Sequence, residues 1–123
     1  MRPLLEAHAA IARKYGVELI AYEGGPGLES SLVPAPYEAP ITALFTAVSR
    51  DPMIGQVYAD LLDTWFGARG GLFMHFQDVV APSRFGSWGL LEYQDQDPAT
   101  APKYQALTRY IAARFGGTKR PNQ

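Results

Sequence analysis

The segment from Val17 to Glu23 constrains the fold more than any other stretch of this sequence. It is a short, almost continuous apolar run rich in β-formers, the pattern of a strand buried on both faces. The run ends at the carboxylate of Glu23, and Gly24 and Gly25 follow. Because an unpaired buried charge is costly, we expect Glu23 to face a cleft or a partner. The carboxyl ends of parallel strands hold ligands and catalytic groups, so Glu23 is the first candidate for a functional residue.

A second buried strand is expected at Leu72–Gln77, where another apolar run follows two glycines. Between the two strands, Asp51 and Pro52 provide an N-cap and a first helical residue. Strands joined through a helix run parallel and cross over with a right hand. The sequence therefore predicts an α/β fold with two parallel strands. Its three main helices are predicted at Pro3–Tyr15, Asp51–Ala68 and Pro102–Phe115, with a short helical segment at Ile41–Val48.

Two long connections and a tail complete the chain. Segment 24–50 is rich in proline and glycine, segment 78–101 is rich in aromatic residues and glycine, and residues 118–123 are expected to fray. A length of 123 residues allows one domain at most. Two parallel strands with open edges need further neighbours. The chain is therefore interpreted as an incomplete slice, 1–123, of a larger α/β domain.

Composition excludes several classes of function. The net charge of -1 provides no basic face for nucleic acid, and no apolar run of membrane-spanning length occurs. The absence of cysteine excludes disulfides and thiolate metal sites but leaves the compartment open. Glu92, Asp95 and Asp97 form an acidic cluster that lacks the further oxygen ligands calcium requires. We expect a solvated face there, and neither a metal nor a cofactor.

Three segments carry a resemblance to a known family. In order along the chain, they are Tyr22–Gly25, Gly70–Phe76 and Gly86–Tyr93. From about Pro3 to Phe115 the chain resembles the C-terminal part of a (β/α)8-barrel glycoside hydrolase, of the clan that includes endoglucanases and mannanases. It is most similar to large bacterial proteins of that clan that are often labelled cellulose-binding or cell-wall hydrolase proteins. The resemblance implies a partial TIM barrel.

The resemblance also implies roles for particular residues. Glu23 would be the catalytic nucleophile at the end of strand seven, which is Val17–Glu23, and Leu72–Gln77 would be strand eight. The three main predicted helices would be helices six, seven and eight. Nothing in the chain matches strands one to six, so the acid/base glutamate of strand four lies outside it. A retaining enzyme needs both carboxyl groups, about 5–5.5 Å apart. The isolated chain is therefore expected to be inactive.

Four further residues are candidates for binding a sugar. Strand alternation places Phe73, His75 and Gln77 on one face, and the polar pair His75 and Gln77 is expected to lie beside Glu23. The alternative for His75 is a hydrogen-bonded core group. Trp88 and, more weakly, Phe85 lie in a loop, and flat aromatic faces stack on pyranose rings. The alternative for Trp88 is that it pins its own loop to the rim.

Three functions therefore stay open. The first is the C-terminal portion of a retaining glycoside hydrolase that acts on O-glycosidic bonds of a polysaccharide. The second is a non-catalytic carbohydrate-binding protein on a TIM-barrel scaffold, and the third is a truncated reading frame without independent function. The expected partner is an oligo- or polysaccharide. The chain is also expected to need either the missing N-terminal part of the barrel or self-association, because its strand edges are open.

Overall fold

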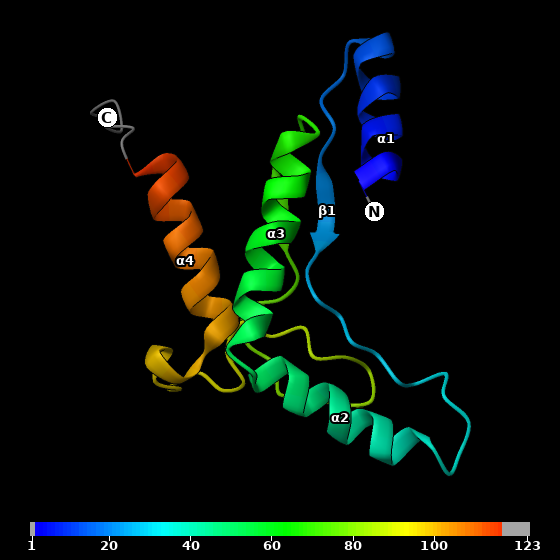
Figure 1. Ribbon diagram of the computed structural model, residues 1–123, viewed down its shortest axis with the longest axis vertical. Coiled ribbons are helices and arrows are strands. Elements are labelled where there is room, and N and C mark those ends of the chain that lie inside the picture. The colour runs from blue at the N-terminus through cyan, green and yellow to red at the C-terminus, as the bar shows by residue number, and fades with distance from the viewer. Residues whose placement is uncertain (1, 117–123) are drawn as a thin grey trace.

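A computed structural model describes residues 2–116, which form four α-helices, two β-strands and one short 3-10 helix (Figure 1). The predicted tail, 118–123, lies outside the described residues. In chain order, the elements are α1 Arg2–Tyr15, β1 Ala21–Gly24, α2 Glu38–Arg50, α3 Met53–Gly67, β2 Phe73–His75, the 3-10 helix η1 Pro98–Thr100 and α4 Pro102–Phe115.

The two strands are adjacent and parallel, as the sequence predicts. The Ala21 N–H donates to the Leu72 carbonyl at 2.9 Å, and the Phe76 N–H donates to the Gly24 carbonyl at 2.9 Å. α2 and α3 lie between the strands in sequence, so the connection is a helical crossover, as parallel pairing requires. Within residues 2–116, the mixed α/β class with a two-stranded parallel sheet is therefore confirmed.

Both strands are shorter than predicted, and a bulge interrupts their pairing. Between the two paired positions β1 spans one residue more than β2, which interrupts the regular ladder. The Leu19 carbonyl still accepts the Gly71 N–H at 2.8 Å, so the chain before β1 runs beside the chain before β2 without forming regular strand. The paired positions are Ala21 with Phe73 and Gly24 with His75.

The helices agree with the sequence patterns except at α2. α1, α3 and α4 begin and end within two residues of the predicted bounds. α2 is longer than the predicted segment Ile41–Val48 and occupies part of the predicted rim loop 24–50. The prolines of that segment favour a loop, but Pro40 falls in the first helical turn, where its missing N–H is tolerated.

α3 is the centre of the molecule. Its side chains Tyr58, Leu62 and Trp65 are 0%, 2% and 5% exposed. The Asp51 carboxylate accepts the Met53 N–H at 2.8 Å and so satisfies a free donor where the helix begins. α4 lies along one side of α3, and β1 lies on the other side (Figure 1).

α3 covers only one face of the sheet. The Phe73 ring meets Trp65 edge to face at 5.8 Å, and the His75 ring meets Tyr58 at 5.4 Å. Because side chains alternate along a strand, the intervening residues point to the opposite face. That open face exposes three large apolar side chains next to and within the strands: Ile20 at 48%, Tyr22 at 75% and Leu72 at 58%.

Candidate functional site

Glu23 lies on the open face at the carboxyl end of β1. It precedes Gly24, whose Cβ position faces the Phe73 ring on the covered side, so we infer that the Glu23 side chain points the other way. The bulge between Ala21 and Gly24 allows the exposed neighbours Tyr22 and Glu23 to share that face. The residue is exposed, and within residues 2–116 no hydrogen bond or ion pair engages its carboxylate. Within this range Glu23 therefore neither caps a helix nor pairs with an arginine. The carboxylate is free to meet a ligand.

The predicted face of Phe73 and His75 is wrong. Both side chains point toward α3, so neither shares the open face with Glu23. His75 instead corresponds to the alternative reading, a hydrogen-bonded group in the interior. Its Nδ1 is hydrogen-bonded to the Tyr58 hydroxyl, and its Nε2 is 3.0 Å from the Gln77 carbonyl oxygen.

Burial dominates the electrostatics of this pair. It lowers the pKa of His75 below its ordinary value, an effect that the hydrogen bond to the Gln77 backbone partly offsets. The same desolvation raises the pKa of the Tyr58 phenol, and the negative charge of Asp78 adds to the rise. Both groups are therefore held in their neutral forms near neutral pH.

Gly24 and Gly25 allow the two strand ends to pack closely. A Cβ at Gly24 would lie 2.4 Å from the Phe73 ring. A Cβ at Gly25, whose φ is 150°, would lie 3.1 Å from the Phe76 carbonyl oxygen and 3.2 Å from the His75 ring. These glycines therefore leave room for the neighbouring strand.

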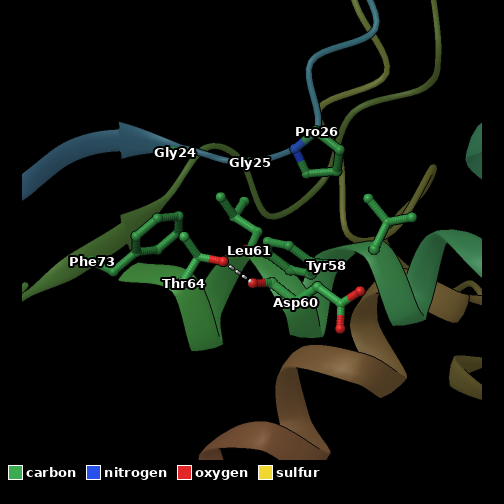
Figure 2. A pocket seen from close by; sticks show the side chains of 9 residues that line it. Gly24, Gly25, Pro26, Tyr58, Asp60, Leu61, Thr64 and Phe73 are labelled. Carbon is green, nitrogen blue, oxygen red and sulfur yellow. Dashed lines mark hydrogen bonds between the residues drawn. The ribbon is translucent and has the colours of Figure 1, made fainter. Parts of the chain in front are cut away.

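A pocket of about 430 Å³ lies beside these glycines, on the covered side of the sheet. Figure 2 shows Gly24, Gly25 and Pro26 along one edge and the α3 side chains along the other, with Phe73 at one end. Its lining is largely apolar, and the Thr64 hydroxyl is turned back to the Asp60 carbonyl at 2.7 Å. The pocket and the Glu23 carboxylate thus lie on opposite faces of the sheet.

Two aromatic side chains meet in the segment after β2. Phe76 follows His75, and its ring meets Trp88 edge to face at 5.6 Å. Trp88 is half-buried, and its indole N–H donates to the Phe85 carbonyl at 2.8 Å. The contacts of Trp88 pin its loop, as the alternative interpretation expects, and leave part of the ring accessible. Phe85 is 61% exposed and lies under the Arg84 guanidinium.

The sequence analysis did not select Phe76 as a site residue. Period-two alternation already separates Leu72, Met74 and Phe76 from Phe73 and His75. The pattern does not show which of these two sets of side chains packs against α3. Because His75 is polar, its set of side chains was predicted to lie on the open face. In the structure the Tyr58 hydroxyl provides a buried hydrogen-bond partner for that histidine.

Gln77 contributes its backbone more than its side chain. Its carbonyl oxygen accepts the Leu90 N–H at 3.1 Å as well as lying next to His75, and the Phe76–Gln77 peptide bond is cis. Within the described part of the chain its amide side chain makes no hydrogen bond. Its predicted contact with a sugar stays a prediction.

Two acidic residues of the second loop, Glu92 and Asp97, have structural partners. Glu92 binds the Arg50 guanidinium through two contacts of 2.7 Å, which lowers the pKa of Glu92. Asp97 accepts the Ala99 N–H at 2.9 Å at the start of η1. Among residues 2–116 there is no group of three or more His, Cys, Asp or Glu side chains suited to a metal ion. Nor does any helix there have the length and apolar character needed to cross a membrane.

Comparisons with protein-family models, with curated proteins and with solved structures found no match to this chain. The functional argument therefore rests on the geometry of the strand ends.

Proposed function

We propose that this chain is the C-terminal part of a retaining glycoside hydrolase that acts on the O-glycosidic bonds of a polysaccharide, with Glu23 as its nucleophile. One observation carries the proposal. Glu23 presents a carboxylate without a partner among residues 2–116 at the carboxyl end of a parallel strand, and the Phe76 and Trp88 rings meet each other in the segment that follows the neighbouring strand. A carboxylate beside accessible aromatic rings is the combination that a sugar-cleaving site needs.

The chemistry follows from these positions. The Glu23 carboxylate attacks the anomeric carbon while a second carboxyl group, outside this chain, protonates the leaving oxygen. Water then hydrolyses the covalent glycosyl-enzyme, and the configuration of the sugar is retained. The Trp88 face stacks on the apolar face of a pyranose ring and holds it beside the nucleophile.

The open sheet supports a larger barrel as the setting for this chemistry. β1 and β2 are both edge strands within the described residues, and their uncovered face carries the candidate site. In an eight-stranded barrel the uncovered face lines the interior, and helices cover the other face. The position of α3 agrees with that arrangement. Six further strands would close the sheet and supply the acid/base residue.

Two steps test the proposal. The coding DNA upstream of Met1 shows whether strands continue in frame and whether one ends in a glutamate. Hydrolysis of soluble cellulose and mannan by the complete protein is then compared with that of Glu23→Gln. The substitution keeps the shape of the side chain but removes the nucleophile, so turnover should fall at least about 10³-fold while glycan binding persists.

The contrary outcomes are distinct. Nearly unchanged turnover in Glu23→Gln would show that the nucleophile assignment is wrong. If both proteins bind glycan and neither cleaves it, a carbohydrate-binding protein on the same scaffold replaces the enzyme. An in-frame stop codon immediately upstream would leave a truncated reading frame.

A further inference from the structure

Lys103, in the first turn of α4, is buried although it carries an amine. It is 4% exposed, and its Nζ donates a hydrogen bond to the Ser87 carbonyl oxygen. Lysine is rarely buried to this degree, since desolvating an ammonium group is costly. That cost lowers the pKa of Lys103 to about 8, and the negative charge of Glu92 partly counters the effect. The group that the Lys103 amine binds is therefore the key to its role.

The Ser87 carbonyl and the Trp88 N–H belong to one planar peptide unit. The hydrogen bond from Lys103 therefore fixes the orientation of the peptide from which the Trp88 side chain projects. On its other side, the Ser87 N–H donates to the Gly27 carbonyl, which ties the second loop to the first. Ser87 itself is 1% exposed, and its hydroxyl oxygen has no partner, so the backbone contacts are what hold this residue.

The Trp88 ring packs closely against two glycines. A Cβ at Gly27 would lie 2.3 Å from the ring, and a Cβ at Gly86 would lie 2.1 Å from its indole nitrogen. The hydrogen bond to the Phe85 carbonyl and the edge contact with Phe76 fix the ring further. A rotation of the Ser87–Trp88 peptide would disturb this packing, because the ring lies close to Gly27 and Gly86.

We propose that Lys103 is a positioning residue for Trp88: through the Ser87 carbonyl it sets the ring against Phe76, on the face that receives a pyranose ring. That a sugar is the ligand of Trp88 depends on the proposed function. The coupling between Lys103 and Trp88 is independent of that function, because it concerns only contacts within this chain. Lys103 acts from the covered side of the site and touches no substrate.

The chain contains two tryptophans, so labelling with 5-fluorotryptophan gives two ¹⁹F resonances, which Trp88→Phe assigns. Lys103→Met keeps the length of the side chain but removes the donor. We expect the Trp88 resonance to shift or split while that of Trp65, in the α3 core, stays in place. Tyr110→Phe is the matched control, because it removes a hydrogen bond of 2.8 Å from the same helix to Asp63 and should move neither resonance. An unmoved Trp88 resonance in folded Lys103→Met would overturn the proposal.

The unmodified chain provides a second measurement in case Lys103→Met does not fold. As pH rises from 7 to 9, the Trp88 resonance should titrate with a midpoint near 8 because the charge of Lys103 is lost. Glu92 and His75 are the other titratable groups that act on this lysine, and both have pKa values lowered below their ordinary ones, so neither titrates in this range. A Trp88 resonance that stays flat through the titration of Lys103 itself, followed by the ¹³Cε resonance of that lysine, would also overturn the proposal.

Cellohexaose separates this inference from the proposed function. Binding should shift the Trp88 resonance of the unmodified chain, and Lys103→Met should weaken that binding about tenfold, the range of one stacking contact. If neither this chain nor the complete protein binds cellohexaose, the sugar site is contradicted, and the resonances without sugar still decide the role of Lys103. Equal binding by both proteins, with Trp88 shifted in the variant, would remove Lys103 from the sugar site.

Discussion

His75 and Glu23 end neighbouring strands and yet have opposite environments. His75 points into the packed layer under α3, where Tyr58 and the Gln77 carbonyl satisfy both ring nitrogens. Glu23 points to the uncovered face and has no partner within residues 2–116. Folding therefore uses the histidine to satisfy buried polar atoms, whereas nothing in the packing of the described chain requires the glutamate. A carboxylate without a structural task is available for chemistry.

The buried lysine predicts an unusual dependence of stability on pH. Because burial lowers the pKa of Lys103 to about 8, folding disfavours its proton, and the unfolded chain binds that proton more tightly. The free energy of unfolding should therefore rise as pH increases above 8, by about 1–3 kcal/mol before the unfolded lysine titrates near 10.5. Urea denaturation at pH 7, 8, 9 and 10 measures the rise.

Tyr58 limits the pH range over which stability rises. Lys103→Met provides the control. The raised pKa of Tyr58 means that above pH 10 the unfolded phenol ionises first, so stability falls again. Lys103→Met should show no rise between pH 8 and 10. A rise of equal size in that variant would assign the effect to another group.

At the scale of elements, the close approach of β1 and β2 depends on Gly24. A Cβ there would lie 2.4 Å from the Phe73 ring, which itself packs on Trp65. We expect Gly24→Ala to lower the free energy of unfolding by about 1–3 kcal/mol, the cost of overpacking a filled site. Chemical denaturation followed by circular dichroism measures the change.

Gly67 at the end of α3 is the matched control for this substitution. A Cβ at Gly67 meets nothing within 4 Å. Gly67→Ala should therefore be neutral or stabilise by up to about 1 kcal/mol, since alanine favours helix over glycine. Equal effects of the two substitutions would show that the strand ends are less tightly packed than described.

Sequence reasoning succeeds for the helices because each carries its own signals. Asp51 caps α3, proline opens α4, and apolar stripes mark the faces that pack. The bounds of the strands cannot be found in the same way. The bulge between Ala21 and Gly24 lies where the ring of Phe73, 49 residues from Gly24 in sequence, meets that glycine. The local sequence pattern around β1 does not indicate that contact.

The candidate site shows the same limit. The position of Glu23 follows from its strand, so the sequence locates it. Which set of alternating side chains lies beside it depends on which face of the sheet α3 covers. Because α3 covers the face of His75, the predicted face of that histidine is not the open one. Lys103 was missed because a lone lysine in the first turn of a helix is ordinarily solvated. Only the folded position of Ser87 shows what Lys103 binds.

At the scale of the whole molecule, the chain exposes more surface than a compact protein of its size. Its accessible surface is 8529 Å², against about 6,500 Å² expected for a compact monomer of this mass.

The isolated chain should therefore self-associate. Ile20, Tyr22 and Leu72 form an apolar patch on the open face, and both strands have free edges within the described residues. Sedimentation velocity from about 1 to 100 µM should show a mass that increases with concentration. Replacing all three side chains with threonine should reduce the association. A monomer across this range, with a cooperative melt at high temperature, would contradict the view that the sheet is incomplete.

The central claim is that Glu23 forms a covalent bond to a sugar, and trapping that bond tests it most directly. A 2-deoxy-2-fluoro glycoside with a good leaving group slows hydrolysis of the glycosyl-enzyme, so the adduct accumulates. The complete protein is treated with this reagent, digested with trypsin and analysed by tandem mass spectrometry. The account predicts one added sugar on the peptide 15–50, located on Glu23 and absent in Glu23→Gln. An adduct on another carboxylate, or hydrolysis that inverts the sugar and leaves no adduct, would contradict it.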